Sequence, residues 1–180
     1  MQVCTEIKTE RLRLIPASVK SMEAEIESPG HLAKFLKLRL PEAWPPPLND
    51  EASQRWMLGY LHKHGGSRWG MWYITLKTKP SQLIGNCGFK GAPVRGAVEI
   101  GYSIAPEHQR RGYASEAVGG LLCFAFADPA VQRVLAETFP DLTPSIGVLR
   151  KCGFRRVQGS SEPGAIRFSL PRHRWEESRR

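Results

Sequence analysis

The stretch Gln109-Arg110-Arg111-Gly112-Tyr113-Ala114 joins a strand-like run, Val98 to Ile104, to a helix-like run that begins near Ala114. The first turn of a helix leaves backbone N–H groups unpaired, and the helix dipole adds partial positive charge there. Glycine lets the backbone approach a phosphate closely, and arginine adds a cationic group that pairs with phosphate oxygens. The sequence therefore predicts that this turn binds a ligand with a pyrophosphate group.

Length and composition place the chain among ordinary globular proteins. With 180 residues, of which 41% are hydrophobic and 24% charged, it is long enough for one domain with a buried core. The first residues lack the basic and then apolar pattern of a signal peptide, and no apolar run approaches the length of a transmembrane helix. We therefore expect a cytoplasmic protein with no membrane partner.

The chain is basic, with a formal net charge of +9. Its basic residues are spread along the whole sequence, so the charge alone does not indicate a nucleic-acid partner, and none is expected. Attraction of a polyanionic cofactor or an acidic partner is an equally good use of this charge. The four cysteines lie far apart and form no C-x-x-C pair, which predicts reduced thiols and no metal site.

Residue patterns predict a mixed order of strands and helices. Hairpin strands dominate the first part, and a βαβα order follows, so we expect an α/β (α+β) fold. The expected strands cover residues 9–15, 69–76, 83–89, 94–104, 131–138, 155–157 and 165–170. The expected helices cover 19–40, broken at 28–30, then a segment from Asn49 or Asp50 to about 61, a segment from about 114 to 127, and a segment from 143 to 152.

With these elements placed, the chain resembles the GNAT superfamily of N-acetyltransferases. Within it, the RimJ/RimL-type branch, which acetylates the α-amine of protein N-termini, is the most similar. Any one matching segment is weak, but their order along the chain is the family's order. The matching segments are Thr9 to Leu14, Trp72 to Ile74, Ile84 to Gly88, Glu99 to Ile104, Gln109 to Ala117, Ser145, Val148 to Phe154, and Trp175.

The resemblance implies a single GNAT-type domain over residues 7–176, with terminal extensions at 1–6 and 177–180. Its centre would be a mixed, mostly antiparallel twisted sheet of six to seven strands flanked by helices. One pair of strands in this sheet would splay apart at the coenzyme A site.

The resemblance also implies the donor, acetyl-CoA, used as a co-substrate without a metal. Backbone N–H groups of the turn would hold its pyrophosphate, and the preceding strand would pair with its pantetheine arm. An asparagine that usually contacts this arm is replaced by Leu142, and the neighbouring Thr143 would supply a hydroxyl instead. The implied donor-binding residues are Ser103, Ile104, Ala105, Gln109, Arg110, Arg111, Gly112, Tyr113, Ala114 and Thr143.

Attack on a thioester needs a neutral amine, so a base must take a proton from the ammonium form. Glu99 is the candidate, because strand alternation places it on one face with Gly101 and Ser103. The alternative is a half-exposed glutamate paired with a lysine. Ser145 is the candidate for a hydroxyl that hydrogen-bonds the departing thiolate, as in RimL-like enzymes, and the alternative is a helix cap. Many GNAT enzymes have a tyrosine acid where this chain has Leu149.

The sequence leaves the acceptor open. The leading hypothesis is an acetyl-CoA-dependent N-acetyltransferase that acts on a protein or peptide N-terminal α-amine. The alternatives are a small-molecule amine, such as a polyamine or an antibiotic, and a non-catalytic acyl-CoA-binding module. A monomer and a homodimer are both compatible with the sequence.

Overall fold

The computed structural model describes residues 6–179. Within them one sheet has eight strands in the order β1-β2-β3-β4-β5-β6-β8-β7, so the expected mixed sheet is confirmed. It exceeds the expected six to seven strands because the two-residue β1 extends one edge, whereas the three-residue β7 at the other edge was expected. The strands are β1 Ile7–Lys8, β2 Leu12–Pro16, β3 Met71–Leu76, β4 Gln82–Phe89, β5 Ala97–Ile104, β6 Arg133–Thr138, β7 Arg155–Val157 and β8 Ile166–Pro171.

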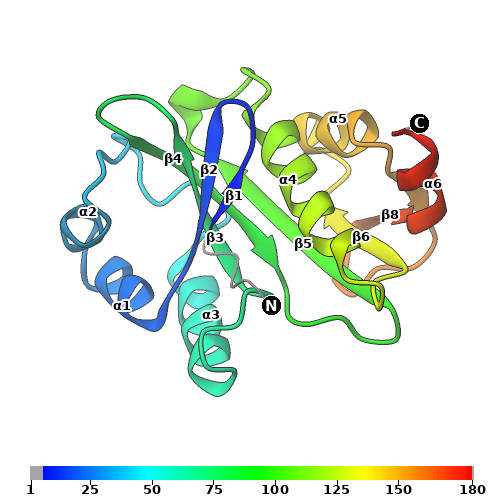
Figure 1. The fold of residues 1–180 in the computed structure, drawn as a ribbon, viewed down its shortest axis with the longest axis horizontal. Coiled ribbons are helices and arrows are strands. Elements are labelled where there is room, and N and C mark those ends of the chain that lie inside the picture. Colours follow the sequence, from blue (N-terminus) through cyan, green and yellow to red (C-terminus); the bar gives the residue numbers. More distant parts are fainter. Residues whose placement is uncertain (1–5, 180) are drawn as a thin grey trace.

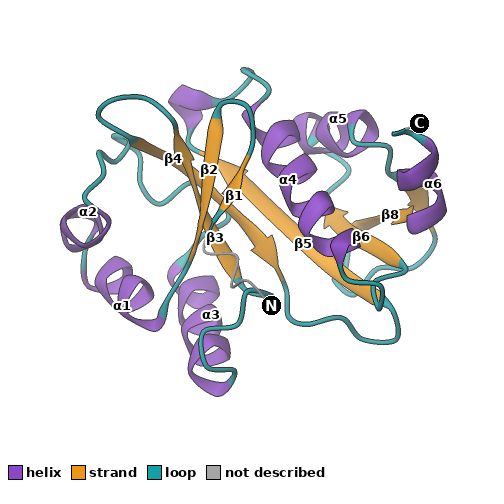
Figure 2. Ribbon diagram, viewed as in Figure 1, coloured by secondary structure: helices purple, strands orange, loops and turns teal. Residues whose placement is uncertain are grey.

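The helices form two groups, with α1, α2 and α3 toward the left of the view and α4, α5 and α6 toward the right (Figures 1 and 2). No helix among residues 6–179 is long and apolar enough to cross a bilayer. The helices are α1 Val19–Glu27, α2 Pro29–Leu36, α3 Glu51–Lys63, the short 3-10 helix η1 Pro106–His108, α4 Tyr113–Ala127, α5 Thr143–Lys151 and α6 Arg172–Glu177.

The two groups of helices cover opposite faces of the sheet. Alternate residues of β3 show this division, because Trp72 and Ile74 pack in the core that contains α4, whereas Met71 and Tyr73 pack in the core that contains α1 and α3. Successive side chains of a strand point to opposite faces, so the alternation follows directly from strand geometry.

Local signals explain where several helices begin. The Asp50 side chain accepts a hydrogen bond from Ser53 N at 2.8 Å and caps α3, so of the two caps predicted from the sequence, Asn49 and Asp50, the structure has Asp50. Ser28 ends α1 and caps α2, and Pro29 occupies the first turn of α2, where its missing N–H costs nothing.

Gly120 lets the hairpin formed by β1 and β2 approach α4 closely. A Cβ added to this residue would lie 3.1 Å from Ile7, 3.2 Å from Thr9 and 3.3 Å from Leu14. Such contacts are tighter than usual, so glycine fits here better than any larger residue. The close packing brings the hairpin tip, residues 9–11, beside the first turns of α4.

The parallel pair β5 and β6 separates part-way along its length. The two strands pair from Ala97 with Arg133 to Ile100 with Ala136, but β5 continues to Ile104 and β6 to Thr138. On its other side β5 stays paired with β4 as far as Ile104. The end of β5 therefore has a sheet partner on one side only, which is the splayed strand pair expected from the sequence.

Candidate active site

The predicted anion-binding turn connects η1 to α4 at the protein surface. Arg110 and Gly112 have left-handed backbone conformations, with φ angles of 60° and 81°, and both are exposed together with Arg111. Gly112 is the N-cap of α4, and no side chain caps this helix. Its first-turn N–H groups therefore lack a side-chain acceptor, the arrangement that an anion needs. Tyr113 and Ala114 are half-buried and begin the helix.

The end of β5 leads into this turn through Ala105 and η1. Gln109 Nε2 donates to Ile104 O at 2.9 Å, which fixes the start of the turn to the strand. Ser103 Oγ donates to Pro47 O at 2.5 Å, so the loop before α3 lies over this residue. Ala105 already uses both backbone groups, because its N–H donates to Ile84 O and its carbonyl accepts from the η1 backbone. Ala105 therefore has no unpaired backbone group left for a ligand. The other two predicted strand residues, Ser103 and Ile104, lie on the part of β5 that no longer pairs with β6.

Glu99 lies on the face of β5 that the sequence predicts, and it is paired with a lysine. Its carboxylate oxygen Oε1 is 2.5 Å from Lys90 Nζ, and the side chains are 17% and 52% exposed, respectively. Glu99, Gly101 and Ser103 are half-buried, whereas the intervening Ile100 packs in the core that contains α4. The two sequence interpretations of Glu99 are therefore compatible: the carboxylate has a lysine partner and also lies on the predicted face.

Ser145 does not cap its helix, because the N-cap of α5 is Leu142 and no side-chain capping bond is present. Its hydroxyl instead lies 3.1 Å from the hydroxyl of Tyr102. The Tyr102 hydroxyl also donates to Ser145 O at 3.0 Å, and burial raises the pKa of Tyr102 to about 12. Tyr102 is therefore a protonated hydrogen-bond donor at neutral pH.

Sequence reasoning missed Tyr102 as part of the candidate site. Strand alternation places its side chain on the face of β5 opposite to that of Glu99. Its partner Ser145 is 43 residues away, and only the folded chain brings the two together. The sequence offered one signal for Tyr102: strand alternation predicts that its side chain and that of Glu99 lie on opposite faces of β5.

The start of α5 carries Thr143, the residue whose hydroxyl is expected to contact the pantetheine arm. Thr143 is exposed at the first position of the helix, where its hydroxyl can face a ligand. Leu149, in contrast, is fully buried in the core. An aliphatic core residue has no proton to donate, so any acid must come from elsewhere, and the Tyr102–Ser145 pair is the nearby hydroxyl pair that the structure offers.

A buried polar cluster lies on the face of the sheet covered by α1 and α3. Glu25 accepts hydrogen bonds from Tyr73 Oη at 2.8 Å, Asn49 Nδ2 at 3.1 Å and Gln54 Nε2 at 3.4 Å. Burial raises the pKa of Glu25, and the hydrogen bonds from Tyr73 and Asn49 oppose this rise. The cluster attaches the loop before α3 to α1 and β3, so it helps to fix the chain that lies over Ser103.

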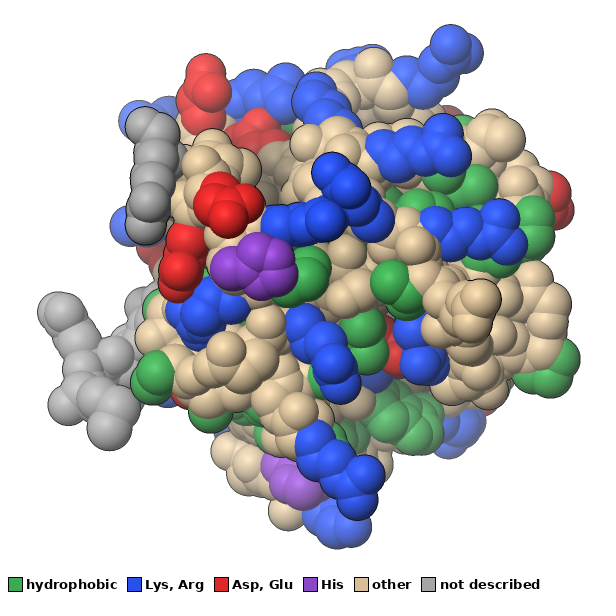
Figure 3. All heavy atoms as spheres, turned by 90° about the vertical axis from the view of Figure 1, so that its right-hand side faces the viewer, with side chains coloured by type: hydrophobic (Ala, Val, Ile, Leu, Met, Phe, Trp, Pro, Cys, Tyr) green, Lys and Arg blue, Asp and Glu red, His purple; other side chains and the backbone are tan. Residues whose placement is uncertain are grey.

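The end of the molecule that carries α5 and α6 is basic. Figure 3 looks onto this end, where Lys and Arg side chains predominate among the charged groups. Arg150, Lys151, Arg155 and Arg156 are exposed there. A positive field of this kind attracts anions to the neighbouring surface. Among residues 6–179, no group of three His, Cys, Asp or Glu side chains is arranged to hold a metal ion.

Comparisons with known proteins agree with this geometry. The uncharacterized N-acetyltransferase YjdG of Bacillus subtilis is 29% identical over 157 residues, which cover 87% of this chain and 93% of the relative. The ribosomal L7/L12 alpha-N-protein acetyltransferase RimL in complex with coenzyme A has a similar structure, with a TM-score of 0.64, 19% identity and coverage of 92% and 97% of the two chains.

The microcin C7 self-immunity acetyltransferase MccE, in complex with acetyl-CoA and AMP, gives a TM-score of 0.61 at 17% identity, with 90% of this chain and 93% of that one covered. These two likenesses show a shared fold. The family described as the acetyltransferase (GNAT) domain matches residues 11–155, which is most of the chain. The protein therefore belongs to the GNAT family and is an N-acetyltransferase.

Proposed function

We propose that this enzyme transfers the acetyl group of acetyl-CoA to a protein or peptide N-terminal α-amine, in the manner of the RimJ/RimL-type branch that its sequence resembles. The observation that supports acetyl-CoA as the donor is the N-terminus of α4, which no side chain caps and which follows the splayed end of β5 and η1. The exposed N–H groups suit a pyrophosphate, and the half-paired strand suits the amide-containing pantetheine arm.

Glu99 is proposed as the base for the acceptor. It removes the proton from the ammonium group, directly or through a water molecule, and the neutral nitrogen attacks the thioester carbonyl carbon. The C–N bond forms, the nitrogen gives up its second proton to the base or to water, the C–S bond breaks, and the sulfur leaves as a thiolate. The Tyr102–Ser145 hydroxyl pair donates a hydrogen bond to this sulfur, which then takes up a proton to give free coenzyme A.

The charges on the Glu99 face favour a singly charged acceptor. On this face of β5, Glu99 is the carboxylate, and Lys90 already balances it. The buried carboxyl of Glu25 is enclosed by hydrogen-bond donors. A polyamine needs several carboxylates to match its charges. An N-terminal α-amine carries one charge and is neutral when it attacks, so a face whose carboxylate is already paired supports a peptide acceptor over a polyamine.

Thiol release tests the proposal. The purified enzyme is incubated with acetyl-CoA and a panel of N-terminal peptides, polyamines and aminoglycosides. We expect turnover with peptides, and a fall in kcat of about 10²–10⁴-fold in Glu99→Gln, the range typical of a lost general base. Glu162→Gln, at an exposed loop position, is the matched control and retains full activity. Equal activity of Glu99→Gln and the control would exclude Glu99 as the base, and turnover restricted to polyamines would exclude the peptide acceptor.

A further inference from the structure

The turn Arg110 to Gly112 has little of its own to keep it in shape. Its residues are exposed, and the left-handed conformation of Arg110 is one that non-glycine residues adopt at some cost in free energy. No hydrophobic packing of these residues offsets that cost. A turn that must present its N–H groups to an anion therefore needs side chains from elsewhere to hold its backbone.

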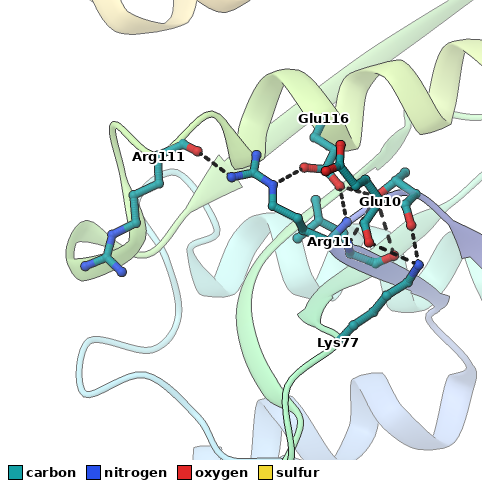
Figure 4. Close-up of polar contacts among 7 residues, drawn as sticks. Glu10, Arg11, Lys77, Arg111 and Glu116 are labelled. Carbon is teal, nitrogen blue, oxygen red and sulfur yellow. Dashed lines mark hydrogen bonds and ion pairs between the residues drawn. The ribbon is translucent and has the colours of Figure 1, made fainter.

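Arg11 supplies such a hold from the tip of the β1–β2 hairpin. Its NH1 group donates to Arg111 O at 3.0 Å, and its Nε donates to Glu116 Oε2 at 2.7 Å. The guanidinium carbon also lies 4.6 Å from the centre of the Tyr113 ring. Figure 4 shows Arg11 lying between the Arg111 carbonyl and the Glu116 carboxylate. One side chain therefore connects the turn to the first turn of α4.

The hairpin tip that carries Arg11 is itself held in place. Lys77 Nζ donates to the carbonyl oxygens of Thr9 and Glu10, as Figure 4 also shows. Thr9 N donates to Leu12 O at 3.0 Å and closes the hairpin turn. The close contact of this tip with Gly120 adds a second anchor. Arg11 therefore extends from a fixed support rather than from a free loop.

Glu116 gives Arg11 a second task. A carboxylate in the first turn of α4 places negative charge beside the N–H groups that would face a pyrophosphate, and it repels that ligand. Burial opposes ionisation of Glu116, but hydrogen bonds from Thr9 Oγ1, Arg11 N and Arg11 Nε lower its pKa below the ordinary value. Glu116 is thus ionised at neutral pH, and the guanidinium of Arg11 neutralises it.

We propose that Arg11 is a positioning residue for the pyrophosphate of acetyl-CoA, which it serves by bracing the Arg111 carbonyl and neutralising Glu116. This inference rests on the proposed function, because it assumes that the turn binds the donor. Arg11 does not touch the reacting atoms. Its loss therefore weakens donor binding and leaves the chemical step unchanged.

The test compares two donors and two arginines. Acetyl-CoA contains the pyrophosphate, whereas S-acetylpantetheine has the same thioester without it. Arg13→Ala is the matched control, because Arg13 lies two residues further along the same hairpin, in β2, is 41% exposed against 45% for Arg11, and pairs with one glutamate, Glu6. Arg11→Ala is expected to raise KM for acetyl-CoA about tenfold, with kcat at saturation and kcat/KM for S-acetylpantetheine changed by no more than about twofold.

A double variant separates the two tasks of Arg11. Adding Glu116→Gln to Arg11→Ala removes the unbalanced carboxylate, so it is expected to recover about half of the lost affinity on a logarithmic scale. A double variant that binds acetyl-CoA no better than Arg11→Ala would refute the neutralisation of Glu116. An equal loss with both donors would show a general structural role for Arg11 and overturn the inference.

Direct titration with coenzyme A distinguishes failure of the inference from failure of the proposed function. If the unaltered enzyme does not bind coenzyme A, both fail together. If the unaltered enzyme binds coenzyme A, and Arg11→Ala binds it as tightly as Arg13→Ala does, the proposed role of Arg11 is wrong and the proposed function is unaffected. Weaker binding by Arg11→Ala than by Arg13→Ala supports the inference.

Discussion

Substitution of Gly85 by alanine is expected to force β4 and β5 apart beside the candidate donor site. A Cβ at this position would lie 2.3 Å from Ser103 O and 3.0 Å from Ile104 Cα. The first distance is about 1 Å shorter than the ~3.3 Å at which carbon and oxygen make close ordinary contacts. Both contacted atoms belong to the backbone of a strand paired with β4, so they have no side-chain rotation that relieves the clash.

The expected cost follows from this geometry. Overpacking of a filled interior costs about 1–3 kcal/mol, and a clash with backbone places Gly85→Ala near the upper value of about 3 kcal/mol. For a domain of this size, each kcal/mol lowers the melting temperature by roughly 2–4 °C. We therefore expect a fall of about 6–12 °C in thermal unfolding followed by circular dichroism, and a matching loss in guanidinium unfolding.

Gly101→Ala provides the control on the neighbouring strand. A Cβ at Gly101 has no heavy atom within 4 Å, so its effect on stability should stay within about 0.5 kcal/mol. If Gly85→Ala were as stable as Gly101→Ala, the close approach of β4 to Ser103 and Ile104 would be refuted. If Gly85→Ala lost stability but kept an unchanged KM for acetyl-CoA, the shifted end of β5 would not form part of the donor site.

Three further substitutions test individual side chains. Because burial raises the pKa of Glu25 in the folded state, the wild type should lose stability relative to Glu25→Gln as the pH rises above 4.5, by up to about 1.4 kcal/mol per pH unit in denaturant titrations; equal pH dependence would contradict this. For Glu137, burial is outweighed by hydrogen bonds from Ser161 and Arg167 that lower its pKa, so the wild type should lose its advantage over Glu137→Gln as the pH falls below 4.5, and the opposite trend in the same titrations would disprove the assignment. Tyr102→Phe removes both hydrogen bonds to the start of α5 and should lower kcat for thiol release about tenfold or more, whereas an unchanged kcat would exclude the hydroxyl from the chemistry.

Local sequence signals predicted much of the fold. Asn49 or Asp50 ahead of a helical pattern predicted the start of α3, and the predicted helix end at residue 127, just before Asp128-Pro129, is the end of α4. Both signals act through hydrogen bonds or backbone restrictions within a few residues, so the sequence contains them in full. The shortest strand of the sheet, β1, was missed, because it has only two residues and its pairing with β2 determines it more than its own pattern does.

Contacts between residues that lie far apart in the sequence could not be predicted from local patterns. The Arg11–Glu116 pair joins residues 105 positions apart, and no periodicity relates them. Ser145 looked like a helix cap because serine often occupies that position, but Leu142 is the N-cap and leaves the Ser145 hydroxyl to meet Tyr102. These partners become neighbours only when α4 and α5 dock on the sheet, which depends on the packing of the whole core.

Glu99 and Tyr102 lie on opposite faces of β5, and this separation sets the direction of proton movement under the proposed chemistry. Each turnover removes two protons from the acceptor ammonium on the Glu99 face and delivers one to the sulfur, which is hydrogen-bonded from the Tyr102 face. The base and the hydroxyl pair therefore act on one thioester carbon from two directions and do not need to touch each other. Attack and departure occur at the same carbonyl carbon and are therefore linked, but an acceptor with a lower amine pKa would still reduce the demand on Glu99.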